Sequence, residues 1–309
     1  MQISGRLSIK CNMNDILKKC TLCPRECGAD RESSQGFCGG GLLPRAAKAY
    51  LHMWEEPCIS GTKGSGTVFF SGCSLKCCFC QNYRISAENF GREISIERLS
   101  EIFLELQDKG AHNINLVSPT HYVPQIIAAL DMCRSKLHIP VAYNCGGYEK
   151  VETIEMLRGY VDIFMPDMKY YSSELSEKYS AAPDYFEYAS KAIARMTEIA
   201  GKPVFDENGI MQRGVIIRHM VLPTHRRDSE EVLKRLYELY GKDSFLLSLM
   251  SQYTPFYKSR EHKEINRRIS TYEYEKVSQL AQEMGFNGFM QERSSAKEEY
   301  TPDFDLIGI

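Results

Sequence analysis

Three cysteines that follow a short apolar run are the most chemically distinctive part of the chain. The run at residues 68–70 has strand character and stops at Gly72, and Cys73, Cys77 and Cys80 follow in a C-x3-C-x2-C spacing. Three thiolates are one too few for a closed zinc site or for a cubane cluster held only by protein. The spacing favours a [4Fe–4S] cluster with one open iron, where a substrate or cofactor can bind. A structural zinc loop completed by a distant cysteine is the alternative.

A second group of cysteines lies closer to the amino terminus. Cys20, Cys23, Cys27 and Cys38 have a C-x2-C-x3-C-x10-C spacing, and four thiolates are enough to close a metal site. Little apolar material surrounds them, so a metal would be the main force that holds this segment together. Zinc and a second iron–sulfur cluster both suit the spacing. Because four ligands leave no open position, we expect a structural role.

The cysteine content fits metal centres better than disulfides. Seven of the twelve cysteines fall into these two groups, and the chain has 309 residues, whereas disulfide scaffolds are short secreted chains. The amino terminus has no apolar core of the signal-peptide type, so we expect a cytoplasmic protein. A net charge of −2 gives no reason to expect nucleic acid, and no apolar run approaches the ~20 residues that span a bilayer.

Beyond the cysteine loop, strand and helix patterns alternate. Strands are expected at residues 46–54, 68–70, 113–118, 140–144, 162–168, 214–222, 245–250 and 287–291. Helices are expected at residues 95–110, where Ser95 is the cap, at 124–133, 153–161, 172–200 with an interruption near Pro183, and 271–285, and from a capping box of Asp228 and Glu231 onward.

This alternation predicts an α/β fold with a parallel sheet covered by helices. From Val68 the pattern gives about six strand–helix units, which are too few for the usual eight-fold barrel. Sites in such sheets lie at the carboxyl ends of the strands. The cysteine loop follows the first of these strands, so the other site residues should lie at or just past the ends of theirs.

Polar side chains stand at four such places: Ser118 and Thr120, Asn144, Asp167 and Lys169, and Arg218. Asp167 and Lys169 are two residues apart and therefore point to the same side of a strand. Arg218 lies within an apolar strand, where a charge is costly unless it is paired, and a guanidinium suits bidentate carboxylate binding. His219 next to it should face the other way and pack in the core.

The cysteine spacing, with Phe79 before the last cysteine, resembles the signature of the radical S-adenosylmethionine (radical SAM) superfamily. The resemblance implies a partial (β/α)6 barrel over residues 46–309, with residues 1–45 as a small cysteine-rich metal-binding segment. It also implies that the cluster of Cys73, Cys77 and Cys80 binds S-adenosylmethionine and cleaves it reductively. The product is a 5′-deoxyadenosyl radical that abstracts a hydrogen atom.

The same resemblance implies roles for the polar residues. The hydroxyls of Ser118 and Thr120 would hold the amino group of the methionine moiety, at the place where the superfamily often has Gly-Gly-Glu. Asn144 begins a turn similar to the Thr-Asn-Gly-like turn of activating enzymes and would approach the ribose. Asp167 and Lys169 resemble an Asp-x-Lys element in which the lysine contacts the carboxylate of S-adenosylmethionine. Arg218 would complete this pocket.

Several stretches are similar to those of pyruvate formate-lyase activating proteins: Glu-Glu-Pro, Cys-Ser-Leu-Lys-Cys-Cys-Phe-Cys-Gln-Asn-Tyr, Pro-Thr-His-Tyr-Val-Pro and Ile-Arg-His-Met-Val-Leu-Pro. This likeness implies a glycine of a partner glycyl radical enzyme as the substrate, and flavodoxin or ferredoxin as the electron donor. A radical enzyme that modifies a small molecule or peptide, and a non-catalytic iron–sulfur or zinc protein, are the alternatives.

Overall fold

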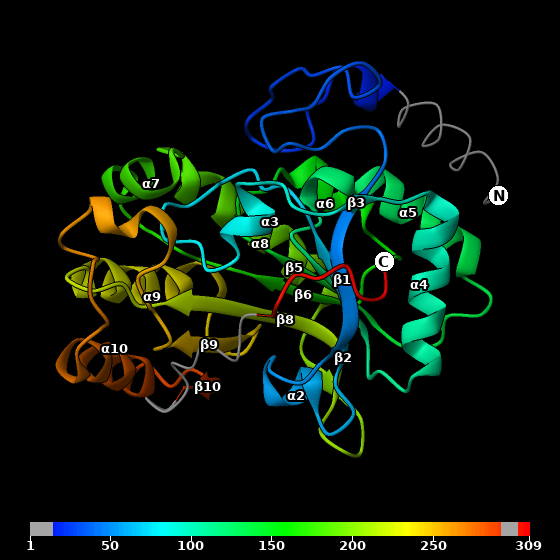
Figure 1. Ribbon diagram of the computed structural model, residues 1–309. Helices are drawn as coiled ribbons and strands as arrows, with labels where there is room; N and C mark the ends of the chain where they lie inside the picture. Colours follow the sequence, from blue (N-terminus) through cyan, green and yellow to red (C-terminus); the bar gives the residue numbers. More distant parts are fainter. Residues whose placement is uncertain (1–14, 292–301) are drawn as a thin grey trace.

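One sheet forms the centre of the molecule (Figure 1). The structure is a computed structural model that describes residues 15–291 and 302–309. Within these residues the sheet has ten strands in the order β10-β9-β8-β6-β5-β4-β2-β1-β3, with β7 paired to β8. The strands are β1 (Arg45–His52), β2 (Ser65–Phe70), β3 (Arg92–Glu93), β4 (Ile114–Val117), β5 (Val141–Cys145), β6 (Ile163–Pro166), β7 (Val204–Phe205), β8 (Met211–Met220), β9 (Leu246–Met250) and β10 (Gly288–Met290).

The predicted parallel sheet is confirmed. Six strands, β2, β4, β5, β6, β8 and β9, run parallel to one another, and the short β10 adds a parallel edge, as expected. Strand β1 is antiparallel to β2 and extends the other edge together with β3. The ends of the sheet do not pair with each other, so the barrel is partial. The parallel register brings the carboxyl ends of the strands to one edge.

Helices connect the parallel strands, and three neighbouring pairs pack together: α4 with α5, α6 with α8, and α9 with α10. The helices are α2 (Pro57–Ser60), α3 (Tyr83–Ser86), α4 (Ile96–Asp108), α5 (Val123–Cys133), α6 (Val151–Met156), α7 (Ser173–Ser180), α8 (Tyr185–Ala200), α9 (Arg226–Tyr240) and α10 (Thr271–Glu283), with 3-10 turns at Thr120–Tyr122 and Tyr257–Glu261. Among these, no helix is long and apolar enough to cross a bilayer.

Local signals place most helix ends correctly. Ser95 caps α4 by accepting the Arg98 N–H, as predicted. The break near Pro183 separates α7 from α8. The predicted capping box of Asp228 and Glu231 is wrong. Helix α9 already begins at Arg226, and the Asp228 carboxylate instead accepts the backbone N–H groups of residues 171 and 172.

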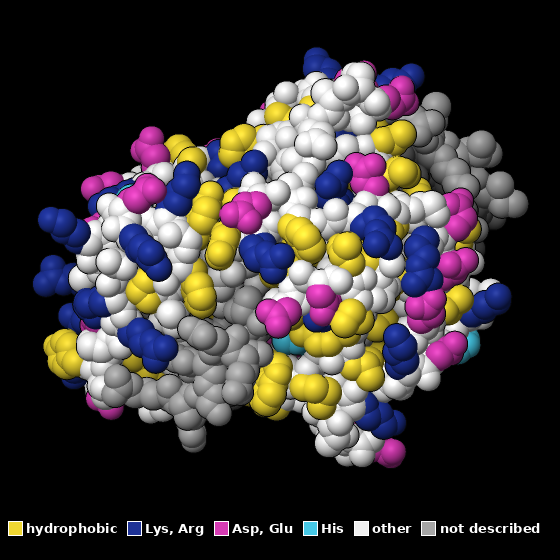
Figure 2. All heavy atoms as spheres, viewed as in Figure 1, with side chains coloured by type: hydrophobic (Ala, Val, Ile, Leu, Met, Phe, Trp, Pro, Cys, Tyr) yellow, Lys and Arg dark blue, Asp and Glu magenta, His cyan; other side chains and the backbone are white. Residues whose placement is uncertain are grey.

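The two ends of the described chain pack on different parts of the molecule. The amino-terminal segment, residues 15–44, lies beside α5 and α6 (dark blue in Figure 1), where Gln125 and Thr153 donate hydrogen bonds to its carbonyls. Residues 302–309 run along β1, where the Ala49 N–H donates to the Ile307 carbonyl oxygen. Positive and negative side chains are interspersed over the face seen in Figure 2, in line with the net charge of −2.

Helix α10 carries a complete capping box, which the sequence reading did not identify. Ser270 accepts the Glu273 N–H, and the Glu273 carboxylate accepts the Ser270 N–H. We predict that Ser270→Ala lowers the free energy of unfolding by about 1 kcal/mol, because the first turn then loses an acceptor. Urea unfolding measures this change. Ser190→Ala, on an exposed part of α8, serves as the control, and an equal midpoint for both variants would contradict the prediction.

Candidate active site

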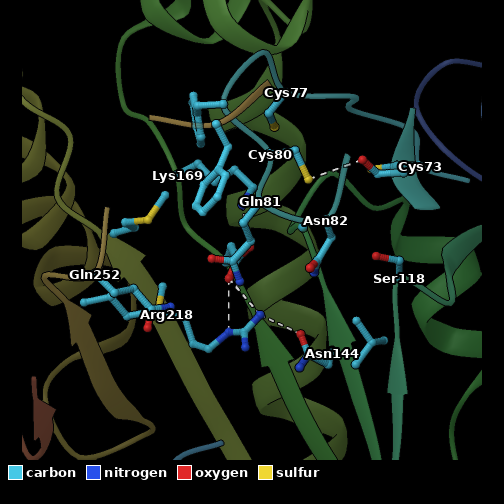
Figure 3. Close-up of a pocket in the computed structure, with 18 of the residues that line it drawn as sticks. Cys73, Cys77, Cys80, Gln81, Asn82, Ser118, Asn144, Lys169, Arg218 and Gln252 are labelled. Carbon is cyan, nitrogen blue, oxygen red and sulfur yellow. Dashed lines mark hydrogen bonds and ion pairs between the residues drawn. The ribbon is translucent and has the colours of Figure 1, made fainter. Parts of the chain in front are cut away.

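A cavity of about 230 Å³ lies at the carboxyl ends of the parallel strands (Figure 3). In the figure the three cysteines lie along its upper part, and Arg218 and Asn144 lie along its lower part. Its lining comprises His52, Trp54, Glu55, Phe69, Cys73, Leu75, Cys77, Phe79, Cys80, Gln81, Asn82, Ser86, Val117, Ser118, Asn144, Cys145, Gly146, Asp167, Lys169, Arg218, Met220, Leu222, Met250, Gln252, Tyr253, Thr254, Phe256 and Pro302. Eight of the nine residues that the sequence assigns to the cluster and cofactor pocket are among them.

The cysteine loop turns sharply after β2. Gly72 has a φ of +94°, and a Cβ there would lie 2.4 Å from the Cys38 carbonyl oxygen, so only glycine fits this close approach. The turn brings Cys73, Cys77 and Cys80 to the cavity, whereas Cys78 points elsewhere and does not line it. Cys78 therefore lies apart from the cavity that the other three cysteines line, as expected from the sequence.

Each of the three sulfur atoms accepts one hydrogen bond. The donors are the Leu75 N–H to Cys73 at 3.4 Å, the Ser180 hydroxyl to Cys77 at 3.0 Å and the Ser86 hydroxyl to Cys80 at 3.3 Å. Burial raises the pKa of the Cys77 thiol, and it raises that of Cys80 to about 12. A metal centre would displace these protons and use the three donors to stabilise the thiolates.

The donor set in the cavity suits a three-cysteine cluster. Cys73, Cys77 and Cys80 line the cavity together with Cys145, which comes from the end of β5. A [4Fe–4S] cluster binds each cysteine at a different iron, so the three thiolates of the loop would leave one iron open.

A buried ion network faces the cysteine loop. Asp167, just past β6, accepts from the Lys169 ammonium at 2.5 Å and from the Arg218 Nε at 3.1 Å. Burial alone would raise the pKa of Asp167, but the two adjacent cations lower it below its ordinary value. Burial opposes the charge of Lys169 as well, yet the Asp167 carboxylate and the nearby Cys77 raise the pKa of the lysine. All three groups are therefore charged at neutral pH.

The network continues into the interior of the barrel. Arg218 also donates to the Asn144 side-chain oxygen at 2.5 Å and forms an ion pair with Glu55 at 3.5 Å. Asn115 and Asn144 donate their amide protons to the other oxygen of Glu55. Burial raises the pKa of Glu55, which Arg218 opposes. Glu56 is buried as well, and its carboxyl group also acts electrostatically on Arg218. Groups of opposite charge thus face one another, which makes burial of this network tolerable.

The two hydroxyls predicted to hold the amino group lie in different places. Ser118 lines the cavity and has a φ of +57°, a backbone conformation that costs energy for a residue with a side chain. Thr120 does not line it. Its hydroxyl donates to the buried Glu149 at 2.6 Å, on the side of the loop that faces away from the cavity. Of this pair, only Ser118 therefore lies beside the cavity.

The turn after Asn144 packs tightly. Gly147 has a φ of +81°, and a Cβ there would lie 2.0 Å from the Asp167 carbonyl oxygen, so the turn needs glycine to reach β6. Gly146 lines the cavity. His219, on the other face of β8 from Arg218, is buried and bonded to the Met168 carbonyl, which confirms it as a packed histidine.

Sequence reasoning missed Glu55. It searched the carboxyl ends of the strands, whereas Glu55 enters the barrel from the loop after the antiparallel β1. The available signal was Glu55-Glu56-Pro57, two acids next to a proline in a chain whose buried Arg218 needs anionic partners. Trp54, 55% exposed, and Gln252 are two further lining residues that no sequence pattern singled out.

The amino-terminal cysteines lie outside this cavity. Cys20, Cys23 and Cys38 are buried and Cys27 is exposed. The sulfurs of Cys20 and Cys38 accept hydrogen bonds from the buried side chain of Arg31.

Comparisons with known proteins place the chain in a family. The model of the radical SAM superfamily matches residues 67–236. The uncharacterized protein MJ0674 of Methanocaldococcus jannaschii is 32% identical over 284 residues, which are 87% of this chain and 75% of that protein. The chain belongs to the radical SAM superfamily. Membership implies a [4Fe–4S] cluster, S-adenosylmethionine and radical chemistry.

Solved structures are similar only at a distance. SuiB of Streptococcus suis bound to S-adenosylmethionine is 15% identical with a TM-score of 0.47, and the match covers 74% of this chain and 50% of SuiB. A domain of a pyruvate-formate lyase-activating enzyme from Bacteroides vulgatus is 13% identical with a TM-score of 0.39, over 55% of this chain and 93% of the domain. The chain thus spans half the length of SuiB, and neither likeness bears on its substrate.

We predict that replacing Cys73, Cys77 and Cys80 together with alanine abolishes reductive cleavage of S-adenosylmethionine, because no ligand for the cluster remains in the loop. Chromatographic detection of 5′-deoxyadenosine measures the reaction. Cys78→Ala, one residue away and outside the cavity lining, is the matched control and should retain cleavage. Cleavage that survives the triple substitution would disprove the assignment.

We predict that Lys169→Ala weakens S-adenosylmethionine binding by roughly 1.5–3 kcal/mol, or about tenfold to a hundredfold, because a charge-assisted hydrogen bond is lost. Equilibrium dialysis of the cluster-loaded protein measures this affinity. Lys178→Ala, which removes an exposed lysine paired with Glu264, should leave the affinity unchanged. If both folded variants bind like the parent, Lys169 serves the structure alone.

Proposed function

We propose that the cavity is the S-adenosylmethionine site and that Cys73, Cys77 and Cys80 hold its [4Fe–4S] cluster. When bound, this pair of cofactors supplies a 5′-deoxyadenosyl radical that removes one hydrogen atom from a substrate. The observation that carries the assignment is the position of the Asp167–Lys169 pair, which faces the three thiols across a cavity that is also lined by Ser118 and Asn144.

In this proposal the residues of the cavity share the work of orientation. The Lys169 ammonium has three protons and uses one on Asp167, so it can also bind the carboxylate of the methionine moiety. Asp167 and Asn144 are held in place by Arg218, whose guanidinium contacts both of them. Ser118 offers its hydroxyl to the amino group or the ribose. The rings of His52, Trp54 and Phe69 line the cavity and offer faces to a purine.

We further propose that the substrate is a glycine of a partner glycyl radical enzyme, whose Cα–H bond is the one broken. The likeness of the cysteine loop, the Asp-x-Lys element and the Arg218 strand to activating proteins supports this substrate. The open sheet supports it as well, since a protein loop needs an unobstructed path to the cavity. Trp54, an exposed aromatic side chain in the lining, offers an apolar contact for such a loop.

A low-potential one-electron donor of the flavodoxin or ferredoxin type completes the proposal, because each cleavage of S-adenosylmethionine consumes one electron. The partner glycine loses a hydrogen atom and keeps an unpaired electron on Cα, and 5′-deoxyadenosine and methionine are the other products.

Electron paramagnetic resonance tests the substrate. The reduced protein is incubated with S-adenosylmethionine and each glycyl radical enzyme of the same source, and we expect a glycyl-type doublet with one of them. The control replaces the activating protein with its triple variant at Cys73, Cys77 and Cys80, which should give no doublet. Absence of a doublet with every such enzyme, together with turnover of a small molecule or peptide, would contradict the glycine substrate and leave the radical mechanism intact.

A further inference from the structure

A second buried arginine lies among the amino-terminal cysteines and has no carboxylate partner in the described structure. Arg31 is 2% exposed. Its Nη2 donates to the Cys20 sulfur at 3.0 Å and lies 3.6 Å from the Cys38 sulfur. Its Nε and Nη1 are buried without a hydrogen-bond acceptor in the part of the chain that the structure describes. Among the described residues, the hydrogen-bond acceptors of this guanidinium are therefore sulfur atoms.

Such a charge needs a nearby anion. A buried cation without a counter-charge is strongly destabilising, and a neutral thiol is a weak acceptor. Thiolates would supply the negative charge, and cysteines are fully deprotonated when they ligate a metal. The position of Arg31 therefore points to anionic sulfur in this segment.

The four cysteines of the group lie close enough to interact with one another, and Cys20 and Cys38 contact the guanidinium. Cys38 interacts electrostatically with Cys20, Cys27 and Arg31, and Cys23 interacts with Cys20 and Cys38. Two glycines allow the backbone to close over the group. A Cβ at Gly36 would lie 3.3 Å from the Cys27 sulfur, and one at Gly40 would lie 2.4 Å from Nη1 of Arg31. These glycines leave room that any larger residue would fill.

Zinc and a [4Fe–4S] cluster can both be ligated by four thiolates. The backbone contact between Cys38 and Cys73 favours the cluster, because it places this group beside the expected redox centre. Four thiolates carry more negative charge than the oxidised [4Fe–4S] core carries positive charge, so the whole centre is an anion that a guanidinium can neutralise and hydrogen-bond.

We propose that Cys20, Cys23, Cys27 and Cys38 ligate a second [4Fe–4S] cluster, with Arg31 as its buried counter-ion. We therefore expect a redox role for this centre, instead of the structural role expected from the sequence. The ligand assignment does not depend on the substrate or even on S-adenosylmethionine cleavage.

The location of this centre gives it a role that rests on the proposed function. The Cys73 N–H donates to the Cys38 carbonyl at 3.2 Å, which joins a ligand of each cluster directly. Arg25, between Cys23 and Cys27, donates to the carbonyls of Ser74 and Ser180 at 2.8 and 2.9 Å. The second cluster is thus adjacent to the first and can pass it one electron from the flavodoxin- or ferredoxin-type donor: the donor is oxidised, and the first cluster is reduced.

Metal analysis tests the site. After anaerobic reconstitution we expect about eight iron atoms in the full chain and about four in the Cys73/Cys77/Cys80 triple alanine variant, with a [4Fe–4S] spectrum by Mössbauer spectroscopy. The reciprocal variant, with serine at positions 20, 23, 27 and 38, should also keep about four. One zinc ion in place of the second cluster, or no metal at all in the alanine variant, would overturn the proposal. If either variant fails to fold, the number of iron atoms bound by the full chain decides whether a second cluster is present.

A redox titration of the same alanine variant tests Arg31. We expect Arg31→Gln to shift the reduction potential of the remaining cluster to more negative values, because a positive charge beside it is lost, and Arg31→Lys to restore most of the shift. Arg158→Gln, an exposed arginine paired with Glu155 on α6, is the control and should not move the potential. Equal potentials in all three variants would show that Arg31 is not the counter-ion.

Stopped-flow reduction tests the relay. With a reduced ferredoxin as donor, the serine variant should lose the fast phase in which the first cluster is reduced in the full chain. An unchanged fast phase would disprove the relay while leaving the second cluster, the S-adenosylmethionine site and the glycine substrate to their own tests.

Discussion

The charge of Arg218 inside the barrel is the constraint on which the candidate active site depends. A guanidinium in a largely buried strand must find anions, and it finds them in segments far apart in the sequence: Asp167 after β6 and Glu55 after β1. The side-chain oxygen of Asn144, near the end of β5, completes its contacts. Satisfying one cation therefore aligns the ends of β5, β6 and β8, and Asp167 and Arg218 form a bridge that extends the pairing of β6 with β8 beyond the strands themselves.

In this arrangement Lys169 is the cation of the network that can still donate hydrogen bonds to a ligand. Among the described residues, the hydrogen-bond partner of its ammonium is Asp167, which also binds Arg218. Because Asp167, Glu55 and Glu56 already act on the neighbouring Arg218, an incoming anionic group would be stabilised by contact with the Lys169 ammonium rather than by a net positive charge. The site can thus accept the zwitterionic methionine moiety without a large change in the electrostatics of the barrel.

Much of this was accessible from the sequence, because the signals were local. The cysteine spacing, the strands that end at Ser118, Asn144 and Lys169, and the cap at Ser95 each depend on a few neighbouring residues. The features that could not be predicted depend on which distant segment packs against a given residue in the fold. Glu55 comes from the loop after the antiparallel β1, and Thr120 turns to Glu149 instead of the cavity. Asp228 had the spacing of a capping box, but tertiary contacts with residues 171 and 172 took its carboxylate.

The two buried arginines show how the same requirement is met in different ways. Arg218 has carboxylates and belongs to a network of side chains that is complete by itself. The hydrogen bonds of Arg31 among the described residues go to the sulfur atoms of Cys20 and Cys38, and two of its nitrogen atoms have no acceptor there. Since the Cys38 carbonyl also accepts the Cys73 N–H, the two sites share a backbone contact. The amino-terminal segment is therefore built into the neighbourhood of the active site.

The central claim is that three cysteines leave one iron open for S-adenosylmethionine beside Lys169. Electron–nuclear double resonance of the reduced protein with S-adenosylmethionine labelled with ¹⁵N and ¹⁷O in the methionine moiety tests it most directly. Direct coupling of the cluster spin to both labels is the predicted result. Full occupancy of the cofactor site without coupling to either label would contradict the account.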